Sequence, residues 1–154
     1  MIIYNDFKEF IQLLNKHKVK YLIVGGYAVS LYSRPRSTDD IDFWIEAKPV
    51  NAKKILKVLK VFGFGELGIT LEDLTRDDFV IQLGHPPIRI DLITTVSGLN
   101  FNDTFKKKKK ETIKGIGDVY FVSYTDLIKN KKKSKRLKDV DALNWIKEYG
   151  KSSS

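Results

Sequence analysis

Two aspartates that alternate with large apolar residues constrain this chain more than any other feature of its sequence. Asp40 and Asp42 lie in residues 38–45, a segment with the alternating pattern of a half-buried strand. Successive side chains of a strand point to opposite faces, so both aspartates are predicted to share one face, opposite Ile41 and Phe43. Two adjacent carboxylates repel each other and lose hydration, which is costly unless a cation lies between them. The pattern therefore predicts a strand that carries a cation site.

A third acid lies in a second alternating run, residues 88–94, which has Asp91 near its centre. If this run is a strand beside the first, Asp91 completes a cluster of three carboxylates. A hard divalent ion such as Mg²⁺ binds one or two carboxylates together with phosphate oxygens and water. Two such ions clamp the attacking and leaving oxygens of a phosphoryl or nucleotidyl transfer. Asp40, Asp42 and Asp91 are therefore the candidate catalytic and metal-binding residues, with two Mg²⁺ ions as the predicted cofactor. The alternative is a group of acids on a solvated strand surface.

Two glycines stand upstream of the acids. Gly25 and Gly26 follow residues 19–24, an apolar run that is typical of a buried strand. Glycines allow a tight turn and let a phosphate approach the N–H groups at the start of a following helix. A Gly-Gly pair alone is more often a simple turn, and only the acids downstream favour a phosphate-binding one. Arg36 and Thr38 come just before the acids, and a planar guanidinium pairs well with phosphate oxygens.

Together these features resemble a known superfamily. The glycine pair, the two alternating aspartates and the distal Asp91 are similar to the pattern of the nucleotidyltransferase (DNA polymerase β-like) superfamily. Residues 36–42 resemble the Arg-x-Thr-x-Asp-Ile-Asp segment of its small bacterial branch, which includes AbiEii-type toxins. Residues 126–141 resemble the Leu-Ile … Lys … Arg-x-Lys-Asp … Asp segment of the same branch. The resemblance extends over about residues 20–145.

The resemblance implies a nucleotidyltransferase fold, an α/β (α+β) domain with a mixed central sheet and flanking helices. It implies Mg²⁺-dependent transfer of a nucleoside monophosphate from a nucleoside triphosphate to a hydroxyl acceptor. The acceptor would be a nucleic acid such as tRNA, or a protein, and an antitoxin partner would belong to a toxin–antitoxin pair. Nucleotide-binding roles fall on seven residues of this sequence: Gly25, Gly26, Arg36, Thr38, Lys131, Arg136 and Lys138.

Two other functions stay open. Gly26 stands where many members of the superfamily have a serine whose hydroxyl contacts phosphate. The chain is also short, with little room for a separate acceptor-binding domain. Both points favour a catalytically weak module that binds nucleic acid or a protein partner, whereas the retained carboxylates favour an enzyme. A transferase of the aminoglycoside-modifying type would need an acidic pocket for a cationic substrate, which a net charge of +9 does not favour.

Composition sets broader limits. With 154 residues we expect one domain over residues 1–150 and a short disordered tail at 151–154. The absence of cysteine excludes disulfides and thiolate zinc sites. We expect a cytoplasmic protein with no membrane partner, because no apolar stretch has the length of a membrane span and the first residues lack the layout of a signal peptide.

The positive charge is concentrated in two segments, residues 106–110 and 129–138. Such segments favour polyanions such as RNA, DNA or nucleotide phosphates. The alternative is a solvated lysine-rich surface, and for the first segment the two are equally favoured.

Periodicity and turn residues predict the remaining elements. A first helix is expected to be capped by Asn5 or Asp6. Residues 101–111 are ambiguous between a lysine-rich helix and a solvated arm. The other expected elements are helices at 27–32, 49–62, 124–133 and 137–149, and hairpins over 79–94 and 112–122.

Overall fold

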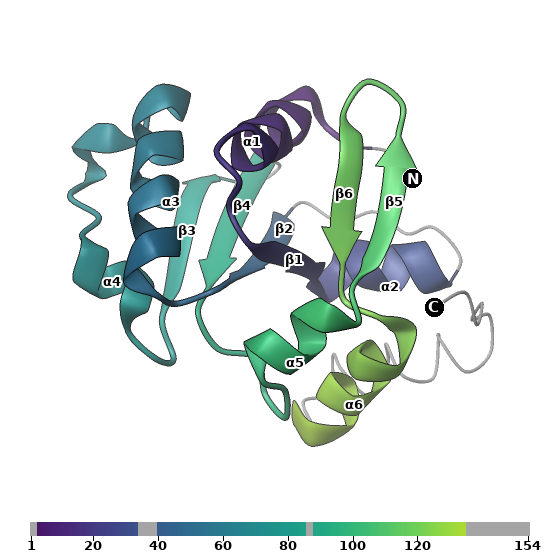
Figure 1. Cartoon of the computed structure of the whole chain (residues 1–154). Helices are drawn as coiled ribbons and strands as arrows, with labels where there is room; N and C mark the ends of the chain where they lie inside the picture. Colours follow the sequence, from purple (N-terminus) through teal and green to yellow (C-terminus); the bar gives the residue numbers. More distant parts are fainter. Residues whose placement is uncertain (1–2, 34–39, 86–87, 135–154) are drawn as a thin grey trace.

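One mixed sheet forms the centre of the molecule (Figure 1). The computed structural model describes residues 3–33, 40–85 and 88–134. In chain order the elements are α1 (Asn5–Lys16), β1 (Tyr21–Val24), α2 (Gly25–Tyr32), β2 (Asp40–Ile45), α3 (Pro49–Phe62), the short 3-10 helix η1 (Gly65–Leu67), α4 (Leu71–Thr75), β3 (Val80–His85), β4 (Ile88–Ile93), α5 (Phe101–Lys106), β5 (Lys109–Ile113), β6 (Gly117–Phe121) and α6 (Tyr124–Ser134).

The strand order places the two predicted acidic strands side by side. The sheet runs β3-β4-β2-β1-β6-β5. The pairs β2–β4 and β1–β6 are parallel, and the other three neighbouring pairs are antiparallel. This mixed sheet with flanking helices confirms the predicted α+β class, and its architecture is that expected of a nucleotidyltransferase-like fold.

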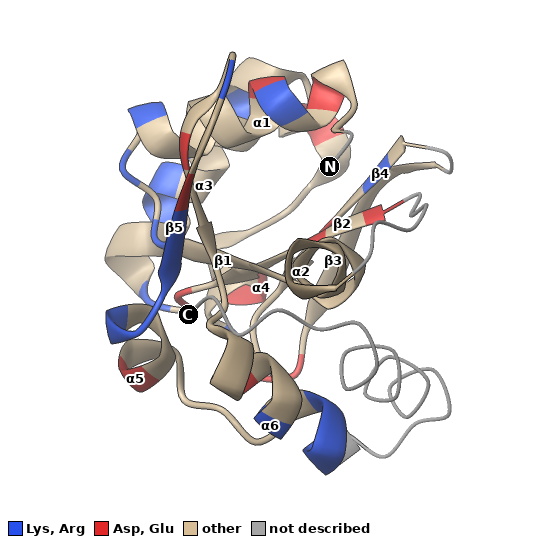
Figure 2. Cartoon of the chain, turned by 90° about the vertical axis from the view of Figure 1, so that its right-hand side faces the viewer, with Lys and Arg blue, Asp and Glu red and all other residues tan. Residues whose placement is uncertain are grey.

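Helices cover both faces of the sheet, as two neighbouring residues of β2 demonstrate. Phe43 packs on Phe10 of α1, with ring centroids 5.4 Å apart, while Trp44 packs on Phe101 of α5 at 5.1 Å. Adjacent strand residues point to opposite faces, so α1 and α5 lie on opposite sides of the sheet. Figure 2 shows α1 above β2 and β4, and α2 and α6 below them. The two aspartates share the face of Trp44, the side of α5.

The long helices form where the apolar periodicity predicts them. α1 buries Phe7, Phe10, Ile11 and Leu14 completely, the spacing of one helical face. Its predicted cap is wrong, because the helix begins at Asn5 and the preceding residue caps it without a side-chain hydrogen bond. α3 starts with a proline in its first turn and ends at Phe62, and the φ of 101° at the next residue, Gly63, is the left-handed conformation that stops helices.

The lysine-rich segment is divided between two elements instead of forming one helix or an arm. α5 ends at Lys106 and the edge strand β5 begins at Lys109. Between them the ammonium group of Lys108 lies 4.1 Å from the ring centroid of Phe105 and 5.6 Å from that of Tyr120. The predicted hairpin at 112–122 therefore starts earlier, while the antiparallel hairpin of β3 and β4 is confirmed.

Two further predictions, the helix at 137–149 and the disordered tail, lie outside the described residues. Within the described part of the chain, no helix combines the length and the apolar character that crossing a bilayer requires.

Candidate active site

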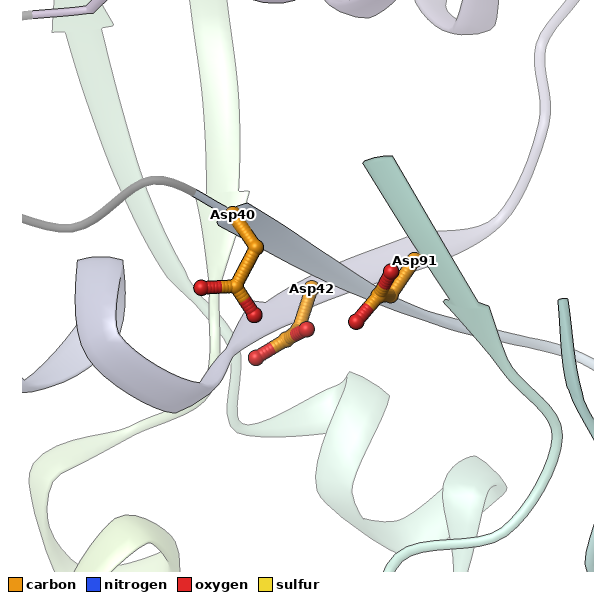
Figure 3. A group of neighbouring side chains, drawn as sticks. All are labelled: Asp40, Asp42 and Asp91. Atoms are coloured by element: carbon orange, nitrogen blue, oxygen red, sulfur yellow. The ribbon is translucent and has the colours of Figure 1, made fainter. Parts of the chain in front are cut away.

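The three predicted carboxylates meet on one face of the sheet (Figure 3). β2 and β4 pair in parallel, and their register places Asp42 directly beside Asp91. Asp40 lies two residues before Asp42, so its side chain points to the same face. Ligand oxygens of the three residues lie within 4.8 Å of one another. Asp91 is buried, with 5% of its surface exposed, and the other two aspartates are half-buried.

The donor set of this cluster fits a hard divalent cation. Asp40, Asp42 and Asp91 offer carboxylate oxygens, without a histidine or cysteine in the group. Oxygen ligands of this kind favour Mg²⁺, Mn²⁺ or Ca²⁺ over zinc. Three negative charges confined to a few ångströms also repel one another strongly at the edge of a protein interior. These residues could therefore hold Mg²⁺, and that role remains a prediction.

A guanidinium group that the sequence did not predict lies among the carboxylates. The Nε of Arg89 donates to Oδ1 of Asp91 at 3.0 Å, and Nη2 donates to Oδ2 of Asp91 at 3.1 Å and to Oδ2 of Asp40 at 3.2 Å. The hydrogen bonds to Asp91, and the charges of all three aspartates, raise the pKa of Arg89 above its ordinary value. One signal was available: Arg89 and Asp91 are two residues apart in a strand and must share a face.

Gly25 lies against the cluster at Asp42. It is the first residue of α2 and has a φ of +69°. A Cβ built on it would meet Oδ2 of Asp42 directly. Backbone conformation and space thus both require glycine at position 25.

The beginning of α2 has the properties of an anion site. Val24 precedes the helix and caps it without a side-chain hydrogen bond, and the first turn carries no acidic residue. The first N–H groups of a helix lack intrahelical partners, and the helix dipole adds partial positive charge there. Because Gly25 abuts Asp42, phosphates held at this turn would lie next to the carboxylates. Gly26 is the second, half-buried residue of the same turn.

Lys131 of α6 reaches the same place. A pocket of about 360 Å³ is lined by Gly25 and Asp42 together with Lys131, which is buried with 6% of its surface exposed. The wall is completed by Val24, Val80, Ile93, Thr95, Val96, Ser97 and Asn130. The volume lies within the range of about 300–1,000 Å³ that is usual for small-ligand sites. A buried ammonium beside the glycine turn suits phosphate oxygens.

The loop after β4, which lines the pocket beside α6, was not predicted. The side-chain amide of Asn130 donates to the carbonyl oxygen of Ser97 at 3.0 Å, which ties the helix to the loop. Two larger hollows, of about 590 and 610 Å³, lie beside α3 and against α1 and include none of the three carboxylates. Volume alone therefore does not single out the pocket that contains a carboxylate of the cluster.

The remaining predicted site residues lie outside the described residues: Arg36, Thr38, Arg136 and Lys138. In the first lysine-rich segment, Lys107 forms an ion pair of 3.2 Å with the buried Asp126 at the start of α6. Together with the position of Lys108 over two aromatic rings, this pair gives two of the five lysines a structural role.

Comparison with known proteins extends over nearly the whole chain. The family model described as "Nucleotidyl transferase of unknown function (DUF2204)" matches residues 3–154. No curated protein matches the sequence.

Proposed function

Because the chain belongs to the DUF2204 family of nucleotidyl transferases of unknown function, we propose that it transfers a nucleoside monophosphate from a nucleoside triphosphate to a hydroxyl group of an acceptor RNA. The observation that carries this proposal is the cluster of three carboxylates beside a helix N-terminus and a buried lysine. Metal-assisted attack on a phosphate requires carboxylates that hold the metal, a turn that binds the phosphates and a positively charged side chain beside them.

Each group has a role in the reaction. The acceptor oxygen forms a bond to the α-phosphorus, the bond from that phosphorus to the bridging oxygen breaks, and pyrophosphate leaves. Asp40 and Asp42 would hold Mg²⁺ against the triphosphate. Bound Mg²⁺ would offset negative charge on the phosphates and make the acceptor hydroxyl more acidic. Asp91 either completes the ligand set or takes the proton that the hydroxyl loses.

The turn at Gly25 and Gly26 would hold the outer phosphates through backbone N–H groups, so the missing serine hydroxyl need not prevent binding. Lys131 would place a positive charge beside the same phosphates, and its burial would strengthen that interaction. Arg36, Thr38, Arg136 and Lys138 are further nucleotide ligands in this proposal, by the sequence resemblance alone.

Charge favours RNA as the acceptor. The net charge is +9, and the exposed lysines Lys129, Lys132 and Lys133 lie on α6 next to the residue that lines the pocket. Figure 2 shows the basic last turn of this helix. A single strand whose backbone follows these lysines would bring a terminal hydroxyl toward the carboxylates. An antitoxin partner belongs to the same proposal and depends only on the resemblance of residues 36–42 to AbiEii-type toxins.

The test is transfer of label from each α-labelled nucleoside triphosphate, with Mg²⁺, to total RNA and to lysate protein. Wild type is compared with a D40A/D42A variant. Label on RNA that disappears in the variant supports the proposal and identifies the donor nucleotide. Label on protein alone would replace RNA by a protein acceptor. No transfer from any donor, by folded protein that still binds RNA, would overturn the enzyme proposal in favour of a binding module.

A further inference from the structure

Arg89 occupies a special position among the residues around the cluster. Its guanidinium donates to both oxygens of Asp91 and to one oxygen of Asp40, all at 3.0–3.2 Å. It lies on the same face of the sheet, because Arg89 pairs with Asp40 in the register of β2 and β4. It thus links two of the three carboxylates, one from each strand.

This geometry gives Arg89 two opposing effects on a divalent cation. By bonding to two carboxylates it fixes their rotamers, which pre-organises them as ligands. Arginine also keeps its charge at every pH at which the protein is folded, so it contributes a permanent positive charge beside the metal position. It further uses lone pairs of Asp40 and Asp91 that a bridging cation would need.

The charges decide which effect dominates before nucleotide binds. Among the charges that the structure describes here, one guanidinium and one divalent ion already offset the three carboxylates, and Lys131 in the pocket beside Asp42 adds a further positive charge. A second divalent ion would make the cluster net positive, in direct repulsion with Arg89. A triphosphate restores negative charge and offers phosphate oxygens as further ligands. The second ion is therefore favourable only together with the nucleotide.

Resting on the proposed function, we infer that Arg89 is a positioning residue that acts as a built-in counter-cation, holding the Asp40–Asp91 side of the cluster closed to a second divalent ion until a nucleoside triphosphate is bound. The second position would fill only together with the nucleotide. In the absence of nucleotide, the guanidinium disfavours binding of a second ion by the carboxylates.

The distinctive consequence is a pair of effects with opposite signs. Removing the charge of Arg89 should tighten binding of divalent ions to the nucleotide-free protein, while it slows transfer because Asp91 loses its two-pronged contact with the guanidinium. A residue that only stabilised the fold would weaken both when it is removed. Arg89→Gln keeps a side-chain amide that can donate to Asp91 and removes the charge, whereas Arg89→Lys keeps the charge and loses the two-pronged geometry.

The experiment is an electron paramagnetic resonance titration of Mn²⁺ into the full chain, with and without a nucleoside triphosphate whose α,β-bridge cannot be cleaved. Circular dichroism confirms that each variant is folded. A unit charge a few ångströms from a divalent ion changes its affinity by about tenfold or more, even at the dielectric constant of water. Without nucleotide we expect the wild type to bind one Mn²⁺. Arg89→Gln should bind this ion about tenfold more tightly and should bind additional Mn²⁺. The Mn²⁺ affinity of Arg89→Lys should be near that of the wild type. Arg76→Gln is the control, since it removes the same charge from a guanidinium that lies over the ring of Phe79, at 4.3 Å from its centroid.

The outcomes separate the two proposals. Equal or weaker Mn²⁺ binding by Arg89→Gln, with clear binding by the wild type, would overturn the counter-cation role and leave the metal site intact. No Mn²⁺ binding by the wild type, even with nucleotide, would overturn both. If Arg89→Gln does not fold, the Nε–H resonance of Arg89 in the wild type gives the answer. Its largest shift should require Mg²⁺ and nucleotide together, and a shift of the same size with Mg²⁺ alone would contradict the inference.

Discussion

Oδ2 of Asp42 lies so close to Gly25 that the Cβ of any other residue at position 25 would clash with it. The glycine that opens α2 is thus in direct contact with a carboxylate of the cluster. The helix N-terminus and the candidate metal ligand form one unit, so the turn cannot accept a side chain without moving the aspartate.

Replacing Gly25 by alanine should damage stability and metal binding together. The new Cβ meets the carboxylate, and alanine is strained at a φ of +69°. Left-handed strain costs about 1 kcal/mol or more, and overpacking typically adds about 1–3 kcal/mol. We expect the free energy of unfolding to fall by about 2–4 kcal/mol in urea denaturation, and Mn²⁺ binding to be lost.

Gly68→Ala is the matched control for this change. Gly68 has a nearly identical φ of +73°, but a Cβ there would have no neighbour within 4 Å. Gly68→Ala should lower the free energy of unfolding by about 1 kcal/mol through backbone strain alone, with Mn²⁺ binding unchanged. Equal losses of stability and equal Mn²⁺ affinities for the two variants would show that the contact with Asp42 has no consequence.

The elements of the sheet could largely be read from the sequence, for physical reasons. β2 and β4 alternate apolar and polar residues because one face packs on α1 while the other carries the site. The capping box of α4, in which Thr70 and Asp73 bond to each other's backbone N–H groups, was present in the sequence and not used. The start of β5 could not be predicted from the sequence. Lysines point to both faces of this edge strand, so its first residues show no alternation of apolar and polar residues.

The site itself was only partly predictable. Asp40, Asp42 and Asp91 could be grouped because period-two spacing fixes their faces once the strands are neighbours. Arg89 was missed, since a charged residue in an alternating strand is usually solvated. Lys131 was assigned to the nucleotide from the family resemblance, whereas its position in the pocket depends on how α6 packs against the loop after β4, a long-range contact that no local pattern encodes.

Lys131 should matter for the nucleotide far more than its neighbours on α6. Lys131→Met removes the buried charge that lines the pocket while keeping most of the length of the side chain. A charge-assisted hydrogen bond contributes about 1.5–3 kcal/mol, so KM for the triphosphate should rise by about 10- to 100-fold. Lys132→Met changes the exposed neighbour and should leave KM within about twofold. A similar rise in both variants would mean that net charge, and not the pocket, controls binding.

Asp42→Asn keeps the size of the side chain and removes one negative charge from the cluster. Because second-shell changes at metal sites already cost about 10- to 100-fold, loss of a direct ligand should lower kcat by at least about 100-fold. Asp77→Asn, an exposed acid outside the cluster, serves as the control and should leave the rate unchanged. Retention of more than about a tenth of the wild-type rate in Asp42→Asn would remove this residue from the ligand set.

Two buried tyrosines predict how stability responds to alkaline pH. Burial raises the pKa of Tyr21 and of Tyr32 above the ordinary value near 10. Their hydroxyls donate to Oδ1 of Asn15 at 3.0 Å and to the carbonyl oxygen of Val122 at 2.8 Å. Above pH of about 10 the unfolded chain loses these protons while the folded chain keeps them, so stability is full below that pH and falls above it.

Above pH of about 10 the free energy of unfolding should fall by as much as about 1.4 kcal/mol per pH unit for each tyrosine. Urea denaturation between pH 8 and 11 measures this change. The Y21F/Y32F variant should be less stable by about 1–3 kcal/mol at pH 8, because two hydrogen bonds are lost. Its stability should then decline less steeply above pH of about 10. Parallel curves for the two proteins would contradict the assignment.

The central claim is that the carboxylates, the Gly25 turn and Lys131 form one site for a nucleoside triphosphate with Mg²⁺. Calorimetric titration with a triphosphate that cannot be cleaved between its α- and β-phosphates tests it without knowledge of the acceptor. We predict saturable binding that requires Mg²⁺, that is lost in Asp42→Asn and Gly25→Ala, and that persists in Gly68→Ala. Binding of equal affinity in the presence of a chelator, or in Asp42→Asn, would place the nucleotide elsewhere and contradict the claim.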